Sequence, residues 1–127
     1  MTRRRVKVFF DGGCRPNPGK IEVAVVARGL VHLFDDLGQG TNTDAEWLAL
    51  IQALRVAQAL NTPDFELIGD SLGVINQANG VWKCRGAALS AHLGTFCALA
   101  MSNPPARIRW APRAQNLAGI ALEKRRN

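Results

Sequence analysis

The segment from Phe65 to Gly69 constrains the fold most strongly, because it is a short and nearly continuous apolar run followed at once by Asp70. Such a run is typical of a central strand that is buried on both faces, as in parallel sheets. Apolar residues recur with helical spacing before it, between Thr43 and Asn61, and after it, from Ser71 to Asn79. We therefore expect an α/β protein in which Asp70 stands at the end of the central strand.

Three further strands are expected before the first helix. The side chains of Arg5–Asp11 alternate, with Val, Val and Phe on one face and Lys, Phe and Asp on the other. Lys20–Arg28 is rich in Val and Ile, and Leu30–Leu37 follows after a turn that Gly29 permits. The segment Gly12–Gly19 contains Gly, Pro and Asn, so we expect it to form the turn between the first two strands. This pattern predicts an antiparallel meander.

The rest of the chain predicts another helix, another strand and a last helix. Gly86–Met101 has helical spacing and is ended by Asn103-Pro104-Pro105, whereas Arg107–Ala111 reads as a strand and Asn116–Lys124 as the last helix. The full order is three strands, a helix, a strand, two helices, a strand and a helix. It indicates a five-stranded mixed sheet with helices on both faces. The sequence contains no internal repeat and no linker, so we expect a single domain over residues 1–127.

The composition is compatible with a nucleic-acid partner. The formal net charge is +6 and the isoelectric point is near 10.0, which suits a polyanion because each neutralised phosphate releases counterions. The chain has an odd number of cysteines, Cys14, Cys84 and Cys97, and no two of them have the spacing of metal ligands. We therefore expect reduced thiols. There is no apolar run long enough to cross a bilayer, and Val6–Phe10 is too short for the apolar core of a signal peptide. We expect a cytoplasmic protein.

Three acidic residues are expected at one edge of the sheet. Asp11 ends the first strand, Glu46 lies in the first turn of the first helix, and Asp70 ends the fourth strand. Carboxylates that converge there would repel one another unless a cation lay between them, and such hard oxygen ligands suit Mg²⁺ or Mn²⁺. Each residue also has a structural alternative. Asp11 would start a turn, and Asp70 would cap the following helix. Glu46 would complete a capping box with Thr43 as the N-cap.

Five segments resemble the motifs of one nuclease family, and they follow one another in the family's order. They are Asp11–Gly19, with Asp-Gly followed by Asn-Pro-Gly; Thr41–Leu50, with Thr-Asn-x-x-Ala-Glu; Gly69-Asp70-Ser71 followed by Val74-Ile75; Val81-Trp82-Lys83; and Trp110–Asn116. One such match would be weak evidence, whereas five in order span nearly the whole chain. The chain therefore resembles the type-1 ribonucleases H.

The resemblance implies a ribonuclease H fold and an endonuclease that hydrolyses the RNA strand of RNA–DNA hybrids, leaving 5′-phosphate and 3′-hydroxyl ends. It implies Mg²⁺ as the cofactor, with Mn²⁺ as a substitute and two ions when substrate is bound. Asp11, Glu46 and Asp70 match the catalytic metal ligands of the family. The implied partner is the hybrid duplex. We expect a monomer with no obligate protein partner and no membrane association.

Six residues match family positions that contact the hybrid. They are Gly12, Gly13, Cys14, Asn17, Asn42 and Trp82. The first three would supply backbone groups at the minor groove, where 2′-hydroxyls mark the RNA strand, and the two asparagines would reach it with their side chains. The tryptophan would lie along the DNA strand. The alternatives are a turn role for Asn17 before Pro18 and a half-buried core position for Trp82.

The sequence departs from the family at its fourth carboxylate. Ile120 occupies the position where most relatives have an Asp, and its side chain cannot bind a metal ion. We expect Asn116 to be the substitute catalytic ligand, since a neutral amide oxygen can coordinate a hard cation. The alternative role for Asn116 is a helix cap, and Glu123 lies one turn further along the helix as another oxygen donor.

Two more departures concern substrate handling. Residues 111–115 contain no His, which many relatives carry in this loop, and residues 82–86 leave no room for the basic protruding helix of some relatives. Three functions remain open: an active hybrid nuclease, a hybrid-binding module without turnover, and a nuclease for another duplex such as double-stranded RNA. The three retained carboxylates argue against the binding module, because anions beside an anionic ligand serve no purpose without a metal ion.

Overall fold

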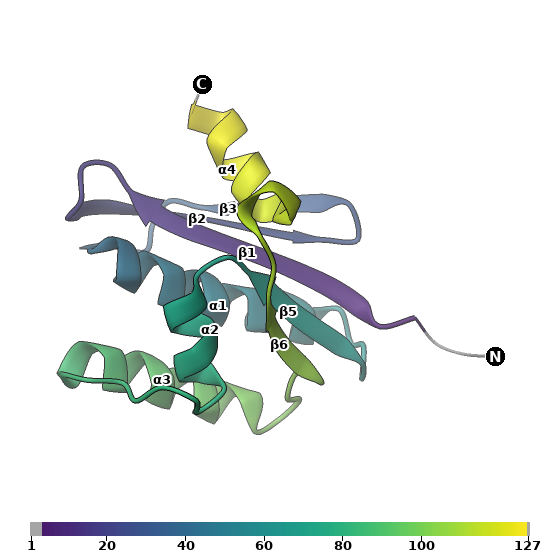
Figure 1. Ribbon diagram of the computed structural model, residues 1–127. Helices are drawn as coiled ribbons and strands as arrows, with labels where there is room; N and C mark the ends of the chain where they lie inside the picture. The colour runs from purple at the N-terminus through teal and green to yellow at the C-terminus, as the bar shows by residue number, and fades with distance from the viewer. Residues whose placement is uncertain (1–3, 127) are drawn as a thin grey trace.

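The computed structural model describes residues 4–126 as a mixed sheet with helices on both of its faces (Figure 1). The elements follow one another as β1 (Val6–Cys14), β2 (Gly19–Ala27), β3 (Leu30–Phe34), β4 (Gln39–Gly40), α1 (Asn42–Ala59), β5 (Phe65–Gly69), α2 (Leu72–Ala78), α3 (Ala87–Ala100), β6 (Arg107–Trp110), the 3₁₀ turn η1 (Arg113–Gln115) and α4 (Leu117–Arg126). The predicted α/β class and the order of the main strands and helices are confirmed.

The sheet has the spatial order β3-β2-β1-β5-β6, with β4 paired to β2 beside this path. β1, β2 and β3 form the predicted antiparallel meander, whereas β5 joins β1 and β6 joins β5 in parallel. All five residues of β5 are buried, as its apolar run predicts. The strand β4 was not expected, since only two of its residues pair with β2 and so short a segment has no readable alternation. The third predicted strand stops at Phe34 rather than Leu37, and β4 follows it after a short connection.

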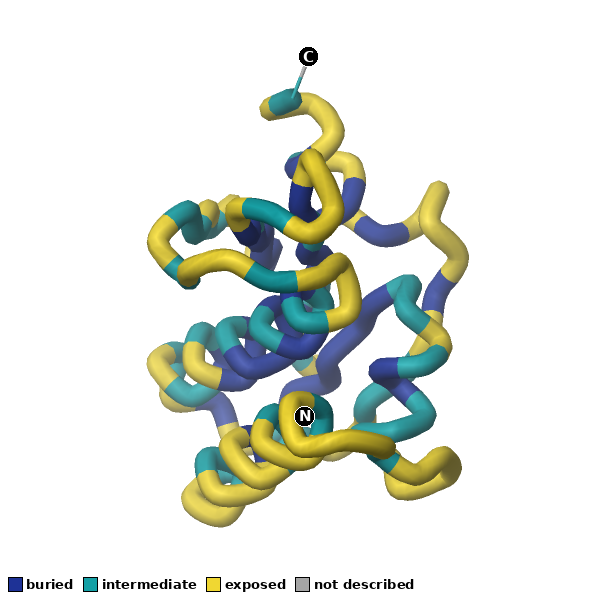
Figure 2. The backbone as a smooth tube through the Cα atoms, turned by 90° about the vertical axis from the view of Figure 1, so that its left-hand side faces the viewer, coloured by how far each residue is buried: buried dark blue, intermediate teal, exposed yellow. Residues whose placement is uncertain are grey.

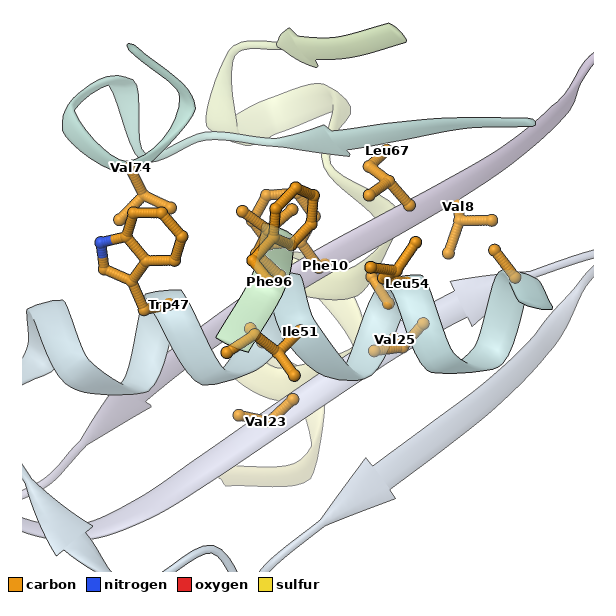
Figure 3. Packing of buried hydrophobic residues seen from close by; sticks show 14 of the residues in the cluster. Val8, Phe10, Val23, Val25, Trp47, Ile51, Leu54, Leu67, Val74 and Phe96 are labelled. Carbon is orange, nitrogen blue, oxygen red and sulfur yellow. The ribbon is translucent and has the colours of Figure 1, made fainter. Parts of the chain in front are cut away.

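The main core lies between the sheet and α1, with α3 packed on the outer side of α1 (Figures 1 and 3). Its largest members include Trp47, Phe10 and Leu54, each almost completely buried. In Figure 2 the buried residues gather in the middle of the molecule, while α3 has Phe96 as its only buried residue. The opposite face of the sheet carries a smaller core, in which α4 packs on β2. Within residues 4–126, no helix is both long and apolar enough to span a bilayer.

β1 extends beyond the predicted strand, and this corrects the assignment of Gly12–Gly19 as a turn. Gly12, Gly13 and Cys14 pair with β2, and the turn is confined to residues 15–18. The sequence reading failed because these glycines serve close packing: a Cβ on Gly12 would lie 2.2 Å from the carbonyl oxygen of Ala45 in α1. As a result, Asp11 lies inside a strand and does not end it, so its predicted alternative role at the start of a turn is wrong.

The first helix also begins earlier than expected. Its N-cap is Thr41, whose hydroxyl oxygen accepts a hydrogen bond from the backbone N–H of Asp44 at 3.1 Å. In return, Asp44 accepts one from the backbone N–H of Thr41 at 3.0 Å. A capping box is present, but it uses this pair and not Thr43 with Glu46, since the shorter Asp closes the box equally well. The carboxylate of Glu46 is therefore not engaged in capping.

Candidate active site

Asp11 and Asp70 reach the same point of the sheet from two neighbouring parallel strands. The register pairs Phe9 of β1 with Ile68 of β5, so two residues further along the same face Asp11 stands level with Asp70. Glu46 approaches from the beginning of α1, which packs directly on β1. Asp11 is 5% exposed and Glu46 and Asp70 are partly buried. The structure thus brings together the three carboxylates that the sequence singled out.

Burial and mutual repulsion dominate the electrostatics of these groups. Burial, together with the negative charge of Asp70, raises the pKa of Asp11 from 3.8 to about 7, although Arg113 acts in the opposite direction. Burial also raises the pKa of Glu46, with Asp70 adding to the effect and a hydrogen bond from Ser71 opposing it. Two carboxyl groups that resist ionisation side by side are groups whose charge a bound cation would stabilise.

Arg113 supplies the positive charge in this part of the structure, and the sequence reading did not identify it. Its Nη1 lies 3.4 Å from Oδ2 of Asp70 and 3.7 Å from Oδ1 of Asp11, and its Nη2 lies 3.9 Å from Glu123. The side chain is 60% exposed and belongs to η1, just before α4. The only signal in the sequence was a single basic residue in the segment between the last strand and the last helix.

The carboxylates match the donor chemistry of a hard divalent cation, although they do not yet enclose one. Within residues 4–126, no three carboxylate, imidazole or thiol groups are close enough to form a metal site as they stand. Instead, the guanidinium of Arg113 balances part of the charge of Asp11 and Asp70. A metal ion held by Asp11, Glu46 and Asp70 would neutralise the same charge, and the side chain of Arg113 is exposed enough to take another position.

Asn116 is completely buried beside Asp70, but its amide is turned away from the predicted ligand role. Its Nδ2 donates to the carbonyl oxygen of Phe10 and to Oδ2 of Asp70, both at 3.0 Å, and its Oδ1 accepts from the N–H of Ala118 at 3.1 Å. The backbone partners fix this orientation, because a carbonyl needs a donor and an N–H needs an acceptor. The geometry therefore fits the helix cap that the sequence left as the alternative, and it does not present an amide oxygen to a metal ion.

A second group of predicted residues meets where the β1–β2 turn touches the start of α1. Oδ1 of Asn42 accepts a hydrogen bond from the backbone N–H of Cys14 at 2.9 Å, and Oδ1 of Asn17 accepts one from the backbone N–H of Asn42 at 3.1 Å. A Cβ on Gly13 would lie 3.6 Å from Oδ1 of Asn42, so the backbone of β1 lies close to this side chain. Both asparagine oxygens are thus used within the protein, whereas their amide N–H groups make no hydrogen bond among residues 4–126 and are available to a ligand.

Trp82 lies apart from that group, in the segment between α2 and α3. Its side chain is 50% exposed, and a Cβ on Gly73 of α2 would lie 3.9 Å from its ring. Trp110 begins the last of the family segments, but the sequence assigns it no role of its own. It is 47% exposed, and its Nε1 donates to the backbone carbonyl of Asp70 at 3.1 Å. This bond ties the end of β6 to the residue that follows β5.

Comparison with curated proteins places these observations in a family. The family model of reverse transcriptase-like proteins matches residues 9–125. Ribonuclease HI of Halobacterium salinarum is 40% identical over 87 residues, which are 61% of this chain and 42% of that protein. The bifunctional protein Rv2228c of Mycobacterium tuberculosis is 30% identical over 118 residues, which are 88% of this chain and 32% of that protein. The chain thus spans less than half the length of these relatives.

Solved structures agree with this result over almost the whole chain. The crystal structure of RNase H1 from Halobacterium salinarum matches with a TM-score of 0.82 and 35% identity, covering 94% of both chains. LC11-RNase H1, isolated from compost by a metagenomic approach and crystallised with an RNA/DNA hybrid, matches with a TM-score of 0.80 and 25% identity, covering 97% of this chain and 100% of that one.

The strand order, the covering helices and the meeting of Asp11 with Asp70 define a ribonuclease H-like domain. Since the family model extends over residues 9–125, the chain belongs to the reverse transcriptase-like family, as a member of its ribonuclease HI type. The predicted resemblance to type-1 ribonucleases H is confirmed.

Proposed function

We propose that the chain is a metal-dependent endonuclease that hydrolyses the RNA strand of RNA–DNA hybrids. The observation that carries this proposal is the alignment of two buried carboxylates, Asp11 and Asp70, on adjacent parallel strands, with Glu46 approaching from α1. A related structure of the same fold is a complex with an RNA/DNA hybrid, which supports the choice of substrate. The net charge of +6 agrees with a polyanionic partner.

Asp11, Glu46 and Asp70 are proposed to hold Mg²⁺, or Mn²⁺ in its place, with two ions when the hybrid is bound. Bound ions of this kind activate a water molecule and stabilise the leaving oxygen in phosphoryl transfer, here leaving 5′-phosphate and 3′-hydroxyl ends. Asp11 is proposed as the central ligand, because it is the most buried of the three carboxylates and stands level with Asp70 on the neighbouring strand. Asn116 is proposed as a positioning residue, since it holds Oδ2 of Asp70 through an N–H donor.

The substrate contacts that we propose are those predicted from the sequence. Most of them lie where the β1–β2 turn meets the start of α1. We propose that the amide N–H groups of Asn17 and Asn42 donate to the minor groove of the hybrid, at the 2′-hydroxyls of the RNA strand. The backbone of Gly12–Cys14 would lie beside the same groove, and the exposed ring of Trp82 along the DNA strand. The hydrogen bonds among Cys14, Asn17 and Asn42 would keep the donors in place.

A cleavage assay with labelled duplexes tests the proposal directly. RNA–DNA, RNA–RNA and DNA–DNA duplexes are each incubated with Mg²⁺, Mn²⁺ or a chelator, and the ends of the products are analysed. We expect cleavage of the RNA strand of the hybrid alone, only with metal, and with a phosphate at the 5′ end of the downstream fragment. Preferred cleavage of RNA–RNA would reassign the substrate, and tight hybrid binding without cleavage would indicate a binding module.

Asp11→Asn provides the matched variant, because it keeps the size of the side chain and removes the charge. It should bind the hybrid as before and lose nearly all cleavage, since the missing charge acts on the transition state. A residual rate above about a tenth of the parental value would correspond to a loss below about 1.4 kcal/mol, which is too small for a metal ligand at the centre of the site.

A further inference from the structure

The sheet face that carries α4 is covered only in part. Phe9 of β1 packs against the small core beneath α4, together with Ala24, Val26 and Leu122. From there α4 runs toward the far end of β1, where Arg126 lies 3.3 Å from Glu22 of β2. The strand pairing sets Glu22 opposite Gly13. The other end of β1, toward Lys7, therefore carries no helix on this side (Figure 1).

Basic residues occupy the uncovered part of the sheet. In the register, Lys7 pairs with Glu66 and Glu66 with Arg107, and Arg28 directly follows Ala27, the partner of Val8. Arg4 and Arg5, which precede β1, and Arg109, which lies two residues after Arg107 in β6, add further cations on this side. We call this group the basic face: Arg4, Arg5, Lys7, Arg28, Arg107 and Arg109.

The basic face has more positive charge than its own carboxylates neutralise. Arg109 lies 2.8 Å from Glu66, and Arg5 lies 2.9 Å from Asp64 and 3.6 Å from Glu66. Among the described residues, no carboxylate lies within 4.0 Å of the charged groups of Arg4, Lys7 or Arg28. These three exposed cations line a hollow of about 800 Å³, which Phe9 also lines. Their stems cover apolar surface, but that role alone does not account for three neighbouring unpaired charges.

The hollow lies on the same sheet face as the candidate active site. Lys7 and Asp11 are both on the outward side of β1 and four residues apart, which corresponds to about 13 Å along a strand. Four base-pair steps of a nucleic-acid duplex cover about the same length, at roughly 3.4 Å each. A duplex held at the carboxylates and running along β1 would reach the basic face with the backbone that lies beyond the cleavage site.

We propose that the basic face binds the phosphate backbone of the nucleic-acid substrate outside the catalytic site, and so extends the footprint of the protein on long duplexes. This inference rests on the proposed function, since it needs a nucleic acid at the carboxylates. The contact is electrostatic and sequence-independent, because the available groups are guanidinium and ammonium ions that point to no particular base.

Binding measurements on duplexes of two lengths test the proposal. In the Asp11→Asn background, fluorescence anisotropy is recorded over a salt series with hybrids of about 6 and about 18 base pairs, the shorter one spanning little more than the catalytic site. The variants are Lys7→Gln, Arg28→Asn and their combination. Asn suits the positive φ of 51° at position 28. Arg55→Gln, an exposed residue of α1 away from the basic face, is the control for the loss of one charge.

Each of the two variants should weaken binding of the long hybrid about three- to tenfold and lower the salt slope by about one, while binding of the short hybrid changes no more than in Arg55→Gln. The proposal would be overturned if Lys7→Gln and Arg55→Gln weakened binding of the long hybrid equally. It would also be overturned if Lys7→Gln or Arg28→Asn weakened binding of the long and the short hybrid equally. The proposed function is judged separately by cleavage in the parental protein. A length-dependent effect without cleavage supports the basic face and refutes the nuclease.

Discussion

The amide nitrogen of Asn116 lies 3.0 Å from Oδ2 of Asp70. Asn116 is completely buried, and its other hydrogen bonds join the backbone of β1 to the first turn of α4 through Phe10 and Ala118. One side chain therefore fixes the position of α4 relative to the sheet and the position of a carboxylate of the candidate active site. The residue that the sequence suggested as a metal ligand acts in the structure as the link between the two.

Replacement of Asn116 by Ala should destabilise the protein strongly. The change leaves the carbonyl of Phe10 and the N–H of Ala118 without partners in a buried place, and an N-cap is lost. We expect a decrease of about 2–4 kcal/mol in the free energy of unfolding, measured by urea denaturation. Gln115→Ala, a change at the exposed neighbouring residue, is the control and should cost less than about 0.5 kcal/mol. Similar losses in both variants would show that the bonds of Asn116 contribute little.

The raised pKa of Asp11 predicts a pH-dependent stability of the metal-free protein. Burial raises the pKa of Asp11 to about 7 in the folded state, against an ordinary value of 3.8, so the folded chain retains a proton that the unfolded chain has lost. The resulting contribution to the free energy of unfolding is fully present below about pH 4. It decreases as the pH rises from about 4 and is lost once the pH has passed about 7. The difference of about three pKa units corresponds to roughly 4 kcal/mol.

Asp11→Asn isolates this effect, because the amide is never charged. In the presence of a chelator, thermal unfolding at pH 8 should show the variant to be more stable than the parent, and the advantage should shrink as the pH falls and vanish near pH 4. Added Mg²⁺ should stabilise the parent more than the variant, since the ion binds the ionised carboxylate. A constant difference across the pH range would contradict the assignment to Asp11.

Much of the fold follows from sequence patterns, since periodicity records which faces are buried. The apolar run of β5 and the spacing in α1 predict those elements directly. Gly12 was misread because the same residue type serves turns and close packing, and only the approach of Ala45 distinguishes the two. The carboxylates are indicated by their positions at strand and helix ends together with the family motifs, whereas the roles of Arg113 and Asn116 depend on long-range contacts that leave no periodic trace.

We expect Arg113 to compete with added cations for the carboxylates, so its removal should strengthen metal binding. Its charge opposes the rise in the pKa of both Asp11 and Glu46, and a divalent ion held by these carboxylates would act in the same direction. Isothermal titration with Mn²⁺ should show a dissociation constant about three- to tenfold lower for Arg113→Gln than for the parent. Arg55→Gln removes an equal charge at a distant exposed site and should leave the constant nearly unchanged. Weaker binding in Arg113→Gln would show that the guanidinium holds the carboxylates in place for the metal ion.

The asparagines at the β1–β2 turn and the start of α1 should act on substrate binding more than on chemistry. Asn42→Ala removes the proposed donor to the minor groove, so KM for the hybrid should rise severalfold with little change in kcat, the sign of lost ground-state binding. Asn17→Ala should act in the same direction. Thr43→Ala, an exposed neighbour of Asn42 in α1, is the control and should leave KM unchanged. An unaltered KM in both asparagine variants would limit them to the hydrogen bonds they make within the protein.

The position of Ile120 allows a direct test of the missing fourth carboxylate. Ile120 is 48% exposed on α4 and lines a hollow of about 440 Å³ together with Arg113, Gly119 and Glu123. A Cβ on the neighbouring Gly119 would lie 3.5 Å from Oδ2 of Asp70, so the first turn of α4 comes close to the carboxylates. A site with three carboxylates attracts a second divalent ion less strongly than one with four, and we therefore expect a high Mg²⁺ requirement and a good response to Mn²⁺.

Ile120→Asp should lower the Mg²⁺ concentration for half-maximal cleavage, because it adds a charge beside the hollow that Arg113 lines. Ile120→Asn has nearly the same shape without the charge and should leave the requirement unchanged. Equal shifts in the two variants would mean that polarity alone alters the site, and no shift in either would place residue 120 outside the metal's reach. If Glu123→Gln by itself abolished cleavage, the fourth ligand would be Glu123, whose carboxylate lies 3.9 Å from Arg113 and is drawn to the same side of the helix.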